Sequence, residues 1–192
     1  QEVIVPKEAG TYEVKAMIFD QNYKGSKSGS FTISSADPVV SVSWSGWTYD
    51  CNSYNATANV FDSNSEPIAN SSVTLSYTGT ENDGTAYGPT DVAPTNAGNY
   101  VVNAFFEGNN NYNPASEDKA IIISKADPTV LTIWSGGNYS GSAFPASSLV
   151  TGVCSDDILN PDIKYSYSGT ENDGTAYGPT DVAPTNAGNY VV

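Results

Sequence analysis

The sequence predicts an all-β chain built from tandem antiparallel β-sandwich modules. The chain repeats itself at a spacing of about 90 residues, and its apolar residues alternate with polar ones in short runs. Gly, Pro, Asn and Asp separate these runs, and no stretch keeps a helical period beyond one turn. Six or seven strands in each repeat indicate an immunoglobulin-like sandwich, with an open barrel as the alternative.

The repeat is clearest in one stretch, because the sequence from Gly79 to Val102 recurs letter for letter from Gly169 to Val192. The same shift of 90 positions aligns upstream residues without a gap. These pairs are Trp44 with Trp134, Tyr49 with Tyr139, Ala56 with Ala146, Val60 with Val150, Ile68 with Ile158 and Tyr77 with Tyr167. The start of the chain matches the end of the module, and Phe31–Ser34 align with Ile121–Ser124. Further upstream, the matching residues are Pro6, Ala9, Gly10, Tyr12, Val14 and Ala16 with Pro94, Ala97, Gly98, Tyr100, Val102 and Ala104.

The repeat divides the chain into three segments. Residues 1–35 are the C-terminal strands of one module, 36–125 form a complete module, and 126–192 are the N-terminal part of a further module. We expect the chain to be part of a longer tandem array. The alternative is a fibre subunit in which copies complete one another head to tail by strand addition.

Within 36–125 the strands are expected in a fixed order. Valines alternate with serines before Trp44, which gives the first strand. Apolar residues at every second position then mark the others. These strands lie around Val40–Trp44, Ala56–Val60, Val73–Tyr77, Ala86–Val92, Tyr100–Phe106 and Ala120–Ser124.

One tyrosine recurs after a Gly turn at the start of a strand, as Tyr12, Tyr100 and Tyr190. In immunoglobulin-like domains a Tyr in this place packs inward and bonds its hydroxyl to the backbone of the corner. We therefore predict three tyrosine corners; an ordinary strand tyrosine is the alternative.

Charge excludes two classes of partner. The chain has 21 acidic residues against seven Lys and Arg together, no His, and a net charge of −14. Nucleic acid and anionic membrane surfaces both require clustered cations. No apolar run approaches the roughly 18 residues of a spanning helix, so we expect no membrane insertion in this segment.

The residues also argue against catalysis. Without His there is neither an imidazole base nor a Ser-His-Asp triad, so we expect no enzyme and no cofactor.

Glu81, Asp83 and Asp91 lie in a repeated loop and would be the ligands if calcium were bound. Their spacing lacks the regular alternation of Asp and Asn ligands found in known calcium loops, and Asp83-Gly84 fits a tight turn better.

Asn55, Asn70 and Asn138 begin Asn-x-Ser/Thr sequons, which are N-glycosylation sites only if the source modifies them.

The sequence resembles a known family in its Trp-x-x-x-x-Tyr-Asp, Tyr-Thr-Gly-Thr, Ala-Pro-Thr-Asn-Ala-Gly-Asn-Tyr and Ile-Ser-Lys-Ala-Asp-Pro segments. These are similar to the MBG/YDG group of bacterial immunoglobulin-like repeats. The resemblance covers the whole chain and implies long, secreted, surface-attached proteins whose modules form the stalks of adhesins. One departure is that the family's Tyr-Asp-Gly reads Tyr49-Asp50-Cys51 in one repeat and Tyr139-Ser140-Gly141 in the other.

The two cysteines have no counterparts in each other's module, since Cys51 aligns with Gly141 and Cys154 with Asn64. Strand topology places the turn of Cys51 at the end of one module and the loop of Cys154 at the facing end of the next. We therefore predict an intermodule disulfide, Cys51–Cys154. Two free or independently buried thiols are the alternative.

These observations favour a structural function. We expect a rigid extracellular spacer, secreted or attached to a cell surface, in a stalk, adhesin or fibre shaft. Its partners would be neighbouring modules and other copies in a fibre. A module that binds glycans or a calcium-dependent ligand through loop 79–93 is the alternative of a different class.

Overall fold

The computed structural model describes residues 5–154, 158 and 161–192, and these form strands, turns and loops with no helix. The predicted segments 1–35 and 126–192 each include a few residues outside this set. None of the described residues belongs to a helix long and apolar enough to cross a membrane. The chain divides into two compact units, residues 1–124 and 125–192, which are described separately.

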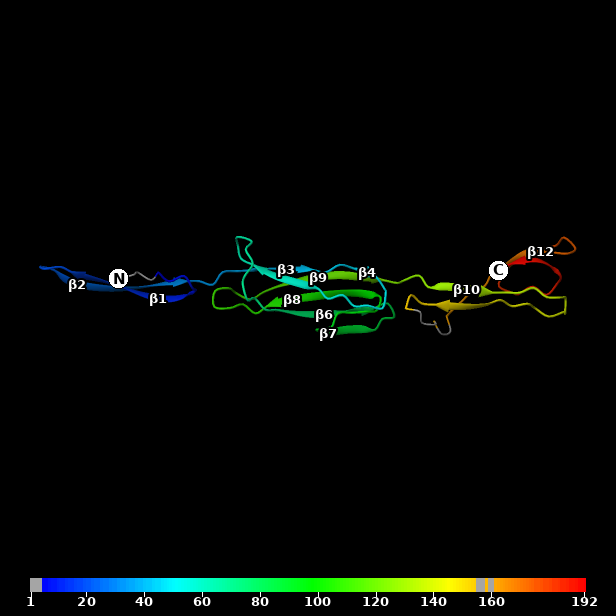
Figure 1. Ribbon diagram of the computed structural model, residues 1–192, viewed down its shortest axis with the longest axis horizontal. Helices are drawn as coiled ribbons and strands as arrows, with labels where there is room; N and C mark the ends of the chain where they lie inside the picture. Colours follow the sequence, from blue (N-terminus) through cyan, green and yellow to red (C-terminus); the bar gives the residue numbers. More distant parts are fainter. Residues whose placement is uncertain (1–4, 155–157, 159–160) are drawn as a thin grey trace. The chain divides into compact units, whose positions relative to one another are not determined.

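The first unit begins with a long antiparallel hairpin of β1 (Gly10–Phe19) and β2 (Lys24–Ile33), drawn in blue in Figure 1. Its register runs without a break from Gly10 opposite Ile33 to Phe19 opposite Lys24. Tyr12 stacks on Phe31 across the hairpin, with ring centroids 5.6 Å apart. The hairpin is otherwise open to solvent on both faces.

The rest of the first unit is a two-layered sandwich. One layer pairs β3 with β5, and the other has the order β4-β9-β8-β6-β7, with β6, β7, β8 and β9 visible side by side in Figure 1. All pairings are antiparallel except that of β4 with β9. The strands are β3 (Val39–Ser43), β4 (Trp47–Thr48), β5 (Thr57–Phe61), β6 (Val73–Glu81), β7 (Ala86–Thr90), β8 (Gly98–Phe106) and β9 (Ala115–Ser124).

The period-two pattern explains how the two layers meet. Alternate residues of β8 face the other layer and are buried, because successive side chains of a strand point to opposite faces. At one end of the sandwich Val40 and Val60 pack with Ala104 and Phe106. The larger cluster lies towards the other end and comprises Trp44, Ala56, Tyr77, Ala93, Tyr100, Val102, Ile121 and Ile123.

The second unit repeats most of this arrangement. One sheet pairs β10 with β11 and the other has the order β13-β12-β14. The strands are β10 (Thr129–Ile133), β11 (Ser147–Thr151), β12 (Tyr167–Glu171), β13 (Ala176–Thr180) and β14 (Gly188–Val191). Shifted by 90 positions, they are the counterparts of β3, β5, β6, β7 and β8. A bulge follows Tyr77 in the β6–β7 pairing and recurs after Tyr167 in the β12–β13 pairing.

Side-chain bonds repeat with the strands. The indole N–H of Trp44 donates to the carbonyl of Tyr54 at 2.8 Å, and that of Trp134 donates to the carbonyl of Phe144 at 2.7 Å. The backbone N–H of Ala56 donates to the hydroxyl of Tyr77 at 2.9 Å, and its counterpart Ala146 donates to Tyr167 at the same distance. The spacing of 90 residues is therefore a structural repeat as well as a sequence repeat.

The all-β prediction and the sandwich prediction are confirmed. The division of the chain after Ser124 lies close to the predicted boundary at 125/126, whereas 1–35 belongs to the same compact unit as the sandwich. The three-segment division and the specifically immunoglobulin-like topology stay predictions from the repeat.

Candidate functional site

The tyrosine corners share one geometry. The hydroxyl of Tyr100 donates to the carbonyl of Asn96, four residues earlier, at 2.8 Å. Tyr12 bonds in the same way to Glu8, and Tyr190 to Asn186, both at 2.8 Å. Burial raises the pKa of Tyr100 above its usual value, and desolvation also raises that of Tyr190. Each bond ties the start of a strand to the loop before it.

The repeated acidic loop folds as a turn. Asp83 accepts the backbone N–H of Thr85 at 2.8 Å, and this bond lowers the pKa of the Asp83 carboxyl. The carboxylate of Glu81 accepts the side-chain amide of Asn96 at 3.0 Å, and Asp91 is exposed. Among the described residues no three His, Cys, Asp or Glu side chains gather as metal ligands. The structure thus does not bring the three predicted calcium ligands together.

The three sequons are accessible. Asn55, Asn70 and Asn138 are exposed, and Asn70 has a left-handed backbone with φ 57°. Asn55 follows the half-exposed ring of Tyr54, whose hydroxyl donates to the Asp50 carboxylate at 2.7 Å. That bond lowers the pKa of Asp50 and raises the pKa of Tyr54.

Both cysteines are disulfide-bonded, and the sequence contains only these two. This supports the predicted Cys51–Cys154 bond. Cys51 has φ 68°, and its counterpart Gly141 has φ 75°. The backbone is therefore left-handed at this turn in both repeats, a conformation that Gly adopts readily and other residues do not. This explains physically why Gly suits the third position of a Tyr-Asp-Gly turn.

A further set of residues joins the hairpin to the sandwich. The N–H of Ala36, in the linker between β2 and β3, donates to the carbonyl of Asn111 at 2.8 Å. The N–H of Asn113 donates back to the carbonyl of Ala36 at 2.8 Å, and its side-chain amide donates to the Asp37 carboxylate at 2.6 Å. The linker is thus bonded in both directions to the loop between β8 and β9.

Asn111 extends this contact to the hairpin itself. Its Oδ1 accepts the backbone N–H of Ala9 at 2.7 Å, and its Nδ2 donates to the Glu8 carboxylate. Asn109 shapes the loop, because its Oδ1 accepts the N–H groups of Asn111 and Tyr112 at 2.9 and 3.0 Å. We call the contact of Ser35–Asp37, Glu8 and Ala9 with loop Asn109–Asn113 the junction clamp.

Sequence reasoning did not predict the junction clamp, although a signal was present. Asn-Tyr recurs at 22–23 and at 111–112. In the first loop Asp20 accepts the N–H groups of Asn22 and Tyr23 at 2.8 and 3.1 Å, as Asn109 does in the second. A loop that keeps its shape and its asparagine in two repeats is a candidate for contact with a neighbouring module.

Comparison with known families gives a match at the start of the chain. A family model described as MBG domain matches residues 1–37, which span the β1–β2 hairpin and the linker up to Asp37. No curated protein matches the chain. The comparisons therefore show that residues 1–37 are similar to the MBG domain.

Proposed function

We propose that this chain is a structural repeat segment of an extracellular stalk, adhesin or fibre shaft, in which it acts as a rigid spacer and performs no catalysis. The proposal is supported by the repeated sandwich, by the MBG match at residues 1–37 and by the junction clamp. Its partners would be neighbouring modules of the same protein.

The junction clamp is the observation that carries the proposal. Segments joined by short linkers usually move relative to one another unless their interface restrains them. Here Ala36 both donates to and accepts from the backbone of loop Asn109–Asn113, so the linker is bonded as a strand would be. The side chain of Asn111 adds two hydrogen bonds, to Glu8 and Ala9, which precede the hairpin in the sequence. A spacer requires this kind of restraint at each joint.

An extracellular location fits the covalent chemistry. Disulfides persist in oxidising compartments and are rare in the cytosol of most organisms. A net charge of −14 also keeps neighbouring copies apart and soluble.

The experiment that tests the proposal compares Asn111→Ala with Asn110→Ala. Asn111 uses its side chain in the clamp, whereas Asn110 contributes its backbone carbonyl, which accepts the hydroxyl of Ser35 at 3.5 Å. Nitrogen-15 relaxation would be measured for residues 10–33 and 39–124. In the wild type and in Asn110→Ala we expect one rotational correlation time for both segments.

In Asn111→Ala we expect a shorter correlation time for residues 10–33 alone, while residues 39–124 keep theirs. Two different correlation times already in the wild type would overturn the spacer proposal. An Asn111→Ala variant indistinguishable from the wild type would show that the clamp does not restrain the joint.

A further inference from the structure

The first unit carries a small pocket where β3 ends and β5 begins. It has a volume of about 380 Å³ and is lined by residues that include Trp44, Trp47, Tyr54, Asn55 and Thr57, and we call it the aromatic pocket. Trp47 belongs to β4, Thr57 is the first residue of β5, and Tyr54 and Asn55 lie just before β5. Small-molecule sites have volumes of roughly 300–1,000 Å³, so the aromatic pocket has room for one small ligand.

Two aromatic rings form a corner of the aromatic pocket. The ring centroids of Trp47 and Tyr54 are 4.9 Å apart, and the ring planes meet at 75°. Trp47 is half-buried and Tyr54 is 47% exposed. The face of an aromatic ring is electron-rich and attracts polarised C–H groups. A pyranose presents such C–H groups on the faces of its ring and hydroxyl groups around its rim, so it is suited to a corner of this kind.

Tyr54 is held at both ends by hydrogen bonds within the protein. Its backbone carbonyl accepts the indole N–H of the buried Trp44 at 2.8 Å, and its hydroxyl donates to the Asp50 carboxylate at 2.7 Å. Asp50 also accepts the backbone N–H of Asn52 at 3.1 Å. A ring that is already held in place loses little conformational entropy when a ligand packs on it. The ring of Tyr54 is therefore a preformed surface.

Polar groups around the aromatic pocket are available to a ligand. Ser45, Asn55 and Thr57 line it and are exposed, and in the part of the chain that the structure describes their side chains have no hydrogen-bond partner. The indole N–H of Trp47 is buried and has no acceptor among the described residues. An indole only donates, whereas an amide or a hydroxyl group both donates and accepts. The hydroxyl groups of a sugar supply partners for all of these groups.

Charge restricts the ligand further. The residues that line the aromatic pocket are all neutral, and the carboxylate of Asp50 is bonded to one of them, Tyr54. The chain has a net charge of −14, which repels anions. A neutral sugar therefore fits these conditions better than an acidic sugar or a phosphate.

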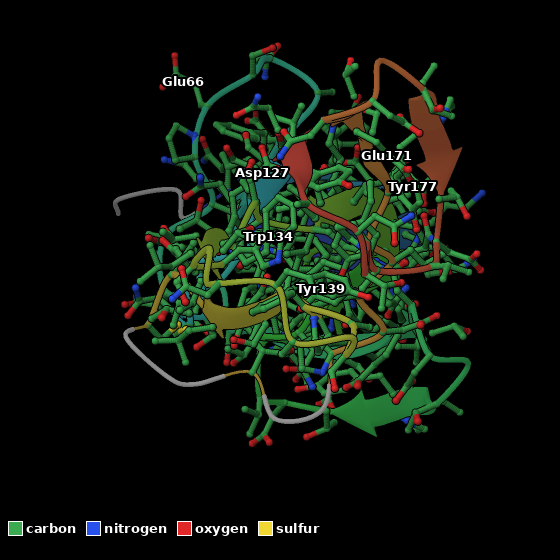
Figure 2. All side chains as sticks on the ribbon, turned by 90° about the vertical axis from the view of Figure 1, so that its right-hand side faces the viewer. Glu66, Asp127, Trp134, Tyr139, Glu171 and Tyr177 are labelled. Carbon is green, nitrogen blue, oxygen red and sulfur yellow. The ribbon has the colours of Figure 1, made fainter. Side chains whose placement is uncertain are left out.

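The second unit offers a comparison within the same chain. Trp134, labelled in Figure 2, is the counterpart of Trp44 and donates its indole N–H to the carbonyl of Phe144 at 2.7 Å. The framework of the segment is thus kept, but the groups at three positions are replaced. At the shift of 90 positions, Gly137 stands for Trp47, Phe144 for Tyr54 and Pro145 for Asn55. The combination of two rings and a free amide is specific to the first unit.

We propose that the aromatic pocket binds a neutral pyranose, such as a terminal hexose or N-acetylhexosamine of a glycan. The sugar packs in the corner of Trp47 and Tyr54, and its hydroxyl groups bond to the side-chain amide of Asn55 and to the hydroxyl groups beside it. This site is separate from the repeated loop 79–93 and requires no calcium. It does not depend on the spacer function.

The test titrates the nitrogen-15-labelled full chain with the methyl glycosides of glucose, galactose, mannose and N-acetylglucosamine. The protein is produced in a host without N-glycosylation, so that Asn55 carries no glycan and the added sugar is the only ligand. We expect at least one sugar to bind with a Kd of about 1 mM or lower and to shift the signals of the Trp47 indole N–H and the Asn55 side-chain amide. Glucuronic acid should bind at least about 10-fold more weakly than the best neutral sugar.

Variants separate the ring of Tyr54 from its hydroxyl. Tyr54→Ala removes the ring and should weaken binding at least about 10-fold, whereas Tyr54→Phe keeps the ring and should hold the Kd within about 3-fold. Asn55→Ala removes the free amide and should weaken binding about 5-fold. Tyr23→Ala is the matched control, because Tyr23 is 73% exposed and does not line the pocket, so the Kd should stay unchanged.

Three results would overturn the proposal. The first is no shift of the Trp47 and Asn55 signals with any of the four neutral sugars at about 20 mM. The second is binding that both Tyr54→Ala and Asn55→Ala leave unchanged, since the sugar would then lie elsewhere. The third is tighter binding of glucuronic acid than of the neutral sugars. The relaxation test of the junction clamp compares residues 10–33 with 39–124 without any sugar, so the two proposals fail separately.

Discussion

Tyr77→Phe isolates one buried hydrogen bond of the repeat. The Tyr77 side chain is 1% exposed and packs on Trp44 with ring centroids 5.2 Å apart, and its hydroxyl accepts the N–H of Ala56 at 2.9 Å. Phe keeps the ring and removes the acceptor. The N–H of Ala56 then stays buried without this partner, because Ala56 itself is 5% exposed.

The magnitude follows from the asymmetry of hydrogen-bond energetics. A bond removed so that a buried donor is left unsatisfied costs about 1–3 kcal/mol. We expect a loss of about 2 kcal/mol in the free energy of unfolding, which is roughly a 30-fold change in the unfolding equilibrium constant. With a urea slope of about 1–3 kcal/mol/M, the midpoint should fall by about 1 M.

The matched control is Tyr54→Phe, the same chemical change at an exposed hydroxyl. Tyr54 is 47% exposed, and the second repeat carries Phe144 at this position. We expect a change within about 0.5 kcal/mol. Both variants would be made in a Trp134→Phe background, so that the fluorescence of Trp44 and Trp47 reports on the first unit alone. Equal effects of the two substitutions would refute the assignment of a buried bond to Tyr77.

Four further predictions concern turns and loops of the first unit. Gly88→Ala should destabilise the first unit by roughly 3 kcal/mol or more in urea unfolding and Gly84→Ala by about 1 kcal/mol. Both have positive φ, but a Cβ at Gly88 would overlap the carbonyl oxygen of Tyr77, whereas at Gly84 the space is open; equal losses would contradict this. The Asp83 carboxyl should titrate below 3.8 by NMR, because the N–H of Thr85 stabilises its charged form. Because the pKa of Asp83 is lower in the folded protein than in the unfolded chain, the ionised carboxylate stabilises the fold at a pH above 3.8. This contribution to the free energy of unfolding is lost as the pH falls below 3.8 and through the pKa of the folded protein. Asp83→Asn should remove this part of the dependence of stability on acid. Cys51→Gly and Cys51→Ser both abolish the disulfide, but the Gly variant should be more stable by about 1 kcal/mol, because φ at this turn is 68°; the reverse order would count against a left-handed turn. Millimolar calcium should leave the melting temperature unchanged, since the structure does not gather Glu81, Asp83 and Asp91; a rise would restore the calcium hypothesis.

The strands were predictable because local alternation determines them. Val40 and Tyr100 lie in the runs expected from the period-two pattern, and both are buried as that pattern requires. The recurrence of 90 positions identified counterparts such as Tyr77 and Tyr167, whose hydroxyls accept the same bond. A repeated tyrosine after a Gly turn also indicated the corner geometry.

Features that depend on distant partners were not predictable. β4 consists of Trp47 and Thr48, and it is a strand only because β9 lies beside it in parallel. The junction clamp requires Asn111 to meet Ala9, 102 positions earlier in the chain. The recurring Asn-Tyr marks the loop as a candidate for contact, but it does not say which residues the loop meets. Val40 is buried because Ala104 and Phe106 of another strand, β8, pack with it.

The central claim is that the junction clamp holds the β1–β2 hairpin and the β3–β9 sandwich as one rigid spacer. Residual dipolar couplings of the wild-type chain test this claim most directly. Couplings would be measured for β1–β2 and for β3–β9 in one weakly aligned sample. The account predicts that a single alignment tensor fits both sets. Separate tensors, with a clearly smaller magnitude for β1–β2, would contradict it.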